Sequence, residues 1–187
     1  MRKFKLQMQT TVDGFVAGTN GELDWMSGWD GDDELKNYVS EITHTVDTIL
    51  MGRKMTDEFV NYWTKVVENP DSPDNAFAKR MVDIPKVVFT KTLDESRWAN
   101  TVLAKGDLVE EVNRRKNQTG KDILVYGGAN FVSSLIKENL IDEYNFFVNP
   151  AAIGNGMTIF EGKFDLTLVK SQAFDSGVIL QSYEPKR

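Results

Sequence analysis

The sequence contains no cysteine among its 187 residues. Disulfides, thiol nucleophiles, iron–sulfur clusters and cysteine-based zinc sites are therefore excluded. A chain without disulfides suits a reducing compartment, so we expect a cytoplasmic protein. The sequence also has a single histidine, His44, and no Gly-x-Ser-x-Gly segment to accompany it. This argues against a hydrolase built on a serine–histidine pair.

Long apolar runs and clustered positive charge are also missing. No apolar run approaches the roughly 18 residues that cross a bilayer, and the opening MRKFKLQMQTTVDG lacks the apolar core of a signal peptide. The formal net charge is −6 and the basic residues are scattered, whereas nucleic-acid binding requires clustered Lys and Arg. We therefore expect a small-molecule ligand, no nucleic acid and no membrane. The length predicts a single domain over residues 1–187.

Strand-like and helix-like patterns alternate through most of the chain. Short apolar runs, apolar on both faces after the first, predict strands at 4–12, 48–52, 86–90 and 122–127. Apolar residues at helical spacing predict helices over 32–43, 54–63, 75–82, 107–118 and 129–140. This alternation predicts an α/β fold with a largely parallel central sheet and flanking helices.

The last third of the chain has a different pattern. Residues 144–150 are strand-like and end at Asn-Pro, and residues 164–174 and 177–185 read as two further strands. Asp175-Ser176-Gly177 between them is a hairpin signal. The parallel core is therefore predicted to acquire antiparallel strands at its C-terminal end.

Glycine, hydroxyl and basic residues gather where predicted strands end and helices begin. Gly127-Gly128 follows one strand directly and opens a helix with Ala129. A helix N-terminus presents free N–H groups and a positive dipole to an anion, and glycine lets the anion approach the backbone. The alternative is a tight turn that needs glycine only for its backbone angles. The spacing is not G-x-G-x-x-G, so the Rossmann fingerprint is absent.

Two more strand ends carry similar residues. In ILMGRKMTDEF, Gly52 ends a strand, Arg53 and Lys54 open a helix and Thr56 adds a hydroxyl. In VVFTKT, the strand ends at Thr90 and Lys91. Ligands of open α/β sheets gather beyond the carboxyl ends of the strands. Together these ends predict a dinucleotide site, in which Arg53 and Lys91 suit an additional 2′-phosphate.

The segment TTVDGFVAGTNGELDWM, residues 10–26, follows the first predicted strand. Its spaced glycines predict a mobile loop, and its apolar side chains suit closure over a flat aromatic ligand. The alternative is a surface loop whose aromatic side chains pack into the core.

Five stretches together resemble the reductase family that shares the dihydrofolate reductase fold. They are TTVDGFVAG, ILMGRKMTDEF, VVFTKT, ILVYGGANFVSSLI and IDEYNFFVNPAAIGNGMTIFEG, in family order over nearly the whole chain. The resemblance is to the branch like the C-terminal domain of the bifunctional riboflavin-biosynthesis deaminase/reductase. It implies a sheet of about eight strands, NADPH as cofactor and a homodimer.

The resemblance also implies roles for particular residues. Those it matches to cofactor-binding positions are Ala17, Gly18, Gly52, Arg53, Thr56, Thr90, Lys91, Gly127, Gly128 and Ala129. Lys54 is also expected to bind the cofactor, because it stands beside Arg53 where the strand ends and the helix begins. Asp13 matches a position near the substrate, and Asp24 is a second candidate for the catalytic carboxylate. Dihydrofolate reductase carries a carboxylate on its first helix, but counting back from Gly52 reaches Lys36, which argues against folate reduction.

Three hypotheses for function remain open at this point. The first is an NADPH-dependent reductase that transfers a hydride to a small pterin- or pyrimidinone-like substrate. The second is a non-catalytic nucleotide- or pterin-binding module of the same fold, and the third is a structural dimerisation domain. The acidic segment DGDDE, residues 30–34, is interpreted as a helix start rather than a metal site, so no metal is expected.

Overall fold

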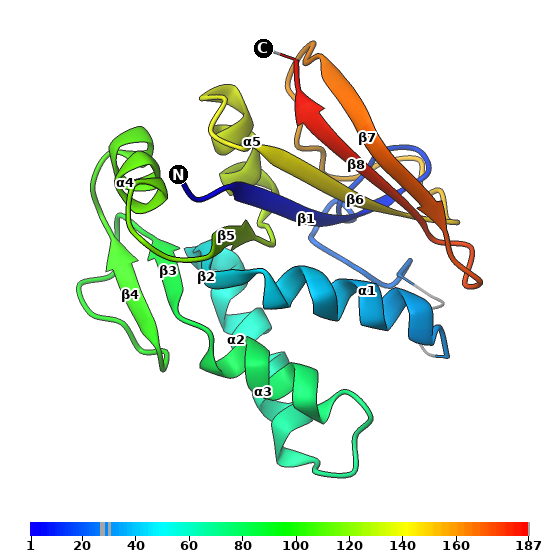
Figure 1. Ribbon diagram of the computed structural model, residues 1–187, viewed down its shortest axis with the longest axis horizontal. Helices are drawn as coiled ribbons and strands as arrows, with labels where there is room; N and C mark the ends of the chain where they lie inside the picture. The colour runs from blue at the N-terminus through cyan, green and yellow to red at the C-terminus, as the bar shows by residue number, and fades with distance from the viewer. Residues whose placement is uncertain (27–28, 30, 187) are drawn as a thin grey trace.

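The computed structural model describes residues 1–26, 29 and 31–186 (Figure 1). Its elements follow the predicted alternation of strands and helices. In chain order they are β1 (Phe4–Thr11), α1 (Asp33–His44), β2 (Val46–Gly52), α2 (Arg53–Glu68), α3 (Asn75–Asp83), β3 (Lys86–Phe89), β4 (Thr101–Ala104), α4 (Leu108–Lys116), β5 (Asp122–Val125), α5 (Ala129–Lys137), β6 (Glu143–Asn149), β7 (Leu166–Ala173) and β8 (Ile179–Pro185). No helix within these described residues is both long and apolar enough to cross a membrane.

All eight strands form one sheet in the order β4-β3-β2-β5-β1-β6-β8-β7. The strands from β4 to β6 pair in parallel, whereas β8 is antiparallel to both β6 and β7. Gly177, with a φ of +84°, turns the chain between β7 and β8. The predicted α/β fold, with its mostly parallel sheet and C-terminal antiparallel hairpin, is confirmed.

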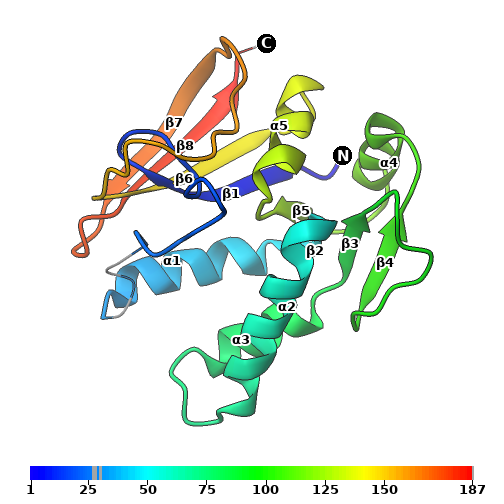
Figure 2. The ribbon, with the colours of Figure 1, turned by 180° about the vertical axis from the view of Figure 1, so that it is seen from behind.

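Helices cover both faces of the sheet, α4 and α5 on one side and α1, α2 and α3 on the other (Figures 1 and 2). Strand β2 shows why its sequence is continuously apolar. Leu50 packs into the core under α4 and α5, while Ile49 and Met51 pack under α2 and α3. A strand buried on both faces has no polar alternation, which accounts for the apolar runs in the sequence.

Strand β4 is absent from the sequence-based prediction. It has four residues, Thr101–Ala104, and lies at one edge of the sheet, where Val102 is exposed. A run this short and half exposed carries little periodicity of its own. Its strand conformation comes from pairing with β3 over the whole length of both strands.

Acidic residues cap two of the helices, as the sequence indicates. Asp32 accepts a hydrogen bond from the Leu35 N–H at the start of α1, and Asp107 accepts two at the start of α4. Asp32 also accepts from the Ser176 N–H at 2.8 Å, which ties the β7–β8 hairpin to α1. Within the segment DGDDE, Asp30 lies outside the described residues.

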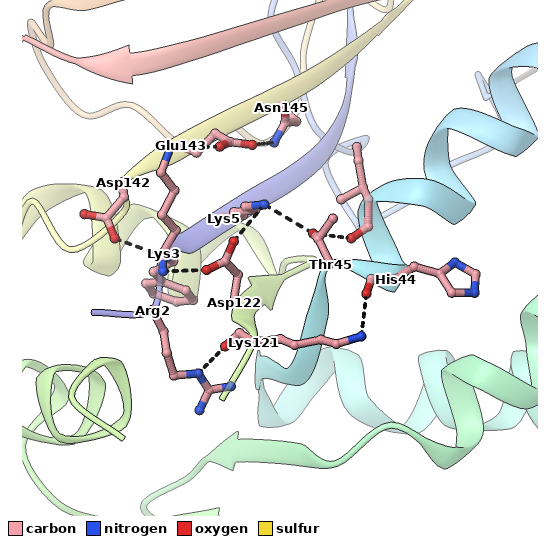
Figure 3. Close-up of polar contacts among 12 residues, drawn as sticks. Arg2, Lys3, Lys5, His44, Thr45, Lys121, Asp122, Asp142, Glu143 and Asn145 are labelled. Carbon is pink, nitrogen blue, oxygen red and sulfur yellow. Dashed lines mark hydrogen bonds and ion pairs between the residues drawn. The ribbon is translucent and has the colours of Figure 1, made fainter. Parts of the chain in front are cut away.

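Ion pairs join the amino ends of neighbouring strands (Figure 3). Lys5 of β1 pairs with Asp122 of β5 at 2.9 Å, and Lys3 pairs with Glu143 of β6 at 3.6 Å. The Phe4 N–H donates to Asp142 at 2.9 Å. Alternating charges on neighbouring strands therefore secure this end of the sheet.

Candidate functional site

The parallel strands bring the predicted cofactor residues together at the carboxyl ends of the strands. Strand β2 lies between β3 and β5 and runs parallel to both. The segments that follow these three strands therefore lie next to one another at their carboxyl ends. These segments are 52–56, 90–92 and 126–129.

Helices α2 and α5 begin side by side at the carboxyl ends of the strands. A Cβ built on Gly52, the residue before α2, would lie 3.0 Å from Cβ of Phe131 in α5. Conversely, a Cβ built on Gly128, the residue before α5, would lie 3.9 Å from Cβ of Met55 in α2. Gly127 has a φ of +148° and faces the Met55 sulfur. The two glycine turns thus form a single junction.

Neither of these helices has a side-chain cap or an acidic residue in its first turn. In contrast, α1 and α4 have both an aspartate cap and acidic residues there. The first N–H groups of an uncapped helix lack partners within the helix, and they carry its positive dipole. The paired starts of α2 and α5 are consequently suited to bind an anion.

Three basic side chains add positive charge around this junction. Arg53 is half-buried at the start of α2, while Lys54 and Lys91 are exposed. No carboxylate within the described part of the chain forms an ion pair with any of the three. Their charge is therefore available to an anionic ligand, and Arg53 offers a planar fork for a phosphate.

The two predicted threonines differ in what they offer. Thr56 is fully buried, and its hydroxyl donates to the Gly52 carbonyl at 3.1 Å. A hydroxyl has one proton, so Thr56 holds the first turn of α2 instead of donating to a ligand in this arrangement. The Thr90 hydroxyl oxygen accepts from the N–H groups of Thr92 and Leu93, each at 3.2 Å. Its proton remains free to donate.

The loop after β1 is hydrogen-bonded to the segment after β6. The Val16 N–H donates to the Met157 carbonyl at 2.9 Å, and the Met157 N–H donates to the Ala17 carbonyl at 2.8 Å. Gly156 lies against this bridge, because a Cβ there would come within 2.3 Å of the Ala17 oxygen. The predicted cofactor-facing residues Ala17 and Gly18 are therefore part of a two-segment structure.

Beyond Gly18 the same loop forms a compact turn. The Gly18 N–H donates to the Glu22 carbonyl at 2.9 Å. Trp25 is buried, while Leu23 and Met26 remain exposed. Trp25 thus packs inward, as the second interpretation from the sequence predicts for its aromatic side chains, while closure of the loop over a ligand stays a prediction.

The two catalytic candidates both adjoin Ile153, in the segment after β6. Asp13 accepts from the N–H groups of Ile153 at 3.1 Å and Gly154 at 2.8 Å. The neighbouring Thr11 hydroxyl and these N–H groups hold the pKa of Asp13 below its usual value. Asp24 lines an open hollow of about 300 Å³ together with Gly18, Trp25 and Ile153. Asp13 is therefore a charged acceptor at neutral pH and a poor proton donor.

Sequence reasoning missed the residues after β6 that organise this loop. Ile153, Gly154 and Gly156 lie in AAIGNGM, and no role was predicted for them. The signal was present as two glycines two residues apart, shortly after the Asn-Pro that ends a strand. Met55, which a Cβ added at either glycine of the Gly127-Gly128 turn would contact, carries no signal of its own.

Residues 2–180 match the family model for the RibD C-terminal domain. The chain belongs to the RibD C-terminal domain family. This family membership confirms the resemblance identified in the sequence. The YyaP protein of Bacillus subtilis (strain 168) is 34% identical to this family member over 181 residues, which cover 95% of the chain and 92% of YyaP.

Two solved structures show the fold that this RibD C-terminal domain shares. The first is a diaminohydroxyphosphoribosylaminopyrimidine deaminase/5-amino-6-(5-phosphoribosylamino)uracil reductase from Thermotoga maritima, with a TM-score of 0.70 and 18% identity over 99% of this chain and 57% of that one. The second is dihydrofolate reductase from Enterococcus faecalis complexed with NADP(H), with a TM-score of 0.62 and 13% identity over 99% and 97% of the two chains. The dihydrofolate reductase-like fold is thus confirmed.

Proposed function

We propose that this protein is an NADPH-dependent reductase that transfers a hydride to a small pterin- or pyrimidinone-like substrate. The observation that carries the proposal is the junction of two uncapped helix starts, surrounded by basic side chains that have no carboxylate partner among the described residues. Family membership supports a reductase-type domain. The dihydrofolate reductase with a similar fold is complexed with NADP(H), which supports the choice of cofactor.

The residues at the junction fit the charged parts of this cofactor. The N–H groups at the starts of α2 and α5 would hold the pyrophosphate, with Gly128 leaving room for close approach. Arg53 and Lys91, with the free proton of Thr90, would hold the 2′-phosphate. Ala17 and Gly18 would cover the nicotinamide side. When bound, the cofactor supplies the hydride, so the chain must only bind, orient and exclude water.

Asp13 and Asp24 are the proposed carboxylates on the substrate side. Because the pKa of Asp13 is lowered, its carboxylate stays charged and can accept a hydrogen bond from a substrate N–H. Its own bonds to Ile153 and Gly154 fix its position. Asp24, on the open hollow, is the second group able to polarise the substrate. The proton that completes reduction would then come from water.

Arg53→Ala tests the assignment of the extra phosphate. We expect NADPH affinity, measured by calorimetry, to fall about tenfold or more, because a hydrogen-bonded charge pair to phosphate is lost. NADH lacks that phosphate, and its affinity should change by less than about twofold. Lys137→Ala, which removes an exposed lysine from the last turn of α5, is the matched control. Equal weakening of both cofactors, or of neither, would remove Arg53 from the site.

A second function has one observation in its favour. Asp13 is held by backbone N–H groups and is a poor proton donor, which would suit a nucleotide- or pterin-binding module without turnover. The loss of nicotinamide absorbance in the presence of a reducible pterin or pyrimidinone distinguishes the two functions. Saturable NADPH binding without any such oxidation would favour the binding module.

A further inference from the structure

A second, larger hollow of about 600 Å³ lies at the amino ends of the parallel strands, opposite the proposed cofactor site at their carboxyl ends. It is bounded by the end of α1, by α3, by the start of β2 and by the residues just before β3 and β5. Its apolar lining consists of the half-buried Phe77 and the exposed Pro85, together with Val46 and Ile84, which are buried. Its volume suits a small organic molecule.

Two cations line this hollow, and neither has a carboxylate partner in the part of the chain that the structure describes. Arg80 donates from Nε to the Thr43 carbonyl at 3.1 Å and from Nη2 to the Val46 carbonyl at 3.0 Å. Lys121 reaches across to the last residue of α1 and donates from Nζ to the His44 carbonyl at 3.0 Å (Figure 3). Over residues 1–26, 29 and 31–186, neither side chain forms an ion pair.

These carbonyl bonds fix the two cations and leave donors unused. A guanidinium has five N–H donors and an ammonium has three. Arg80 retains both hydrogens on Nη1, and Lys121 retains two on Nζ. Since carbonyl oxygens are neutral, these bonds do not neutralise the positive charge of either side chain.

The acidic residues of the hollow already have cationic neighbours. Asp47 pairs with Arg2 and accepts from the Lys121 backbone N–H at 2.8 Å. Asp83 lies close enough to the buried ammonium of Lys86 to favour its charged form. Within the described residues, neither carboxylate therefore forms an ion pair with Arg80 or Lys121.

We propose that this hollow binds a small organic anion with a flat apolar body, of the aromatic carboxylate class. The apolar lining accepts the ring, while Arg80 and Lys121 supply charge-assisted hydrogen bonds to the carboxylate. The site is separate from the cofactor junction, because it lies at the amino ends of β2, β3 and β5 and the junction lies at their carboxyl ends. The two ligands bind at the same time.

Calorimetry with 2-naphthoate tests this proposal, with the neutral 2-naphthamide as the comparison ligand. We expect saturable one-to-one binding of 2-naphthoate to the intact protein, unchanged by saturating NADPH. The affinity for the amide should be lower by at least about tenfold, because the amide lacks the negative charge. Lys121→Met, which keeps length and loses charge, should weaken 2-naphthoate about tenfold. Lys137→Met is the matched control and should leave binding unchanged.

Arg80 also holds the end of α1, so a steric variant gives a cleaner test than its removal. Ala76 is exposed on α3 and lines the hollow, so Ala76→Trp fills it without removing a hydrogen bond. We expect this variant to abolish binding, while Ala99→Trp, at an exposed turn elsewhere, keeps it. The proposal is overturned by an absence of binding, by equal binding of the amide, by displacement with NADPH, or by binding that survives Ala76→Trp.

Discussion

We expect Gly156→Ala to separate the loop after β1 from the segment after β6. The added methyl would lie 2.3 Å from the backbone oxygen of Ala17, a distance at which the backbone must move. The movement would break the hydrogen bonds that Met157 shares with Val16 and Ala17, at 2.9 Å and 2.8 Å. Two such bonds stabilise a fold by about 2 kcal/mol together. For a chain of this size the loss lowers Tm by about 4–8 °C.

The assay is thermal unfolding alongside NADPH titration, with Gly162→Ala as the control. Gly162 lies in the same segment, but a Cβ there meets nothing within 4 Å. The Gly156 variant should also bind NADPH more weakly, because the loop carrying Ala17 and Gly18 no longer has its partner. If both variants match the wild-type protein in Tm and in affinity, the pairing of the two loop segments is refuted.

Three further outcomes are expected. Gly128→Val should abolish NADPH binding with little change in Tm, because its Cβ meets nothing closer than 3.9 Å and only the helix start is obstructed; unchanged affinity would contradict the site. Burial lowers the pKa of Lys86 to about 8 from 10.5. Between these pH values the unfolded chain therefore holds a proton that folded Lys86 has released. As pH increases through this range, the free energy of unfolding of the wild type, measured by chemical unfolding, should rise relative to that of Lys86→Met. A constant difference would contradict the lowered pKa. Asp13→Asn should lower Tm at neutral pH, and the difference should shrink as pH falls below 3.8 and disappear once the pH is below the lowered pKa of folded Asp13; a difference that does not change with pH would contradict the lowered pKa.

The sequence alone predicted most elements because their patterns are local. The apolar run around Leu50 requires a strand buried on both faces, and Asp107 followed by a periodic segment requires a capped helix. The glycine turns at Gly52 and Gly128 were also readable, since each stands between a strand pattern and a helix pattern. Strand β4 was not readable, because pairing with β3 determines it.

Other features depend on contacts between residues distant in sequence. The turns at Gly52 and Gly128 share one junction because β2 and β5 are neighbours in the sheet, although three helices and two strands separate β2 from β5 along the chain. Likewise, the bonds of Asp13 come from Ile153 and Gly154, 140 and 141 residues away. Local periodicity identifies the residues that can bind an anion or carry charge. Strand order determines which of them share a site. That order depends on how whole elements pack against the sheet, and it cannot be read from the spacing of neighbouring residues.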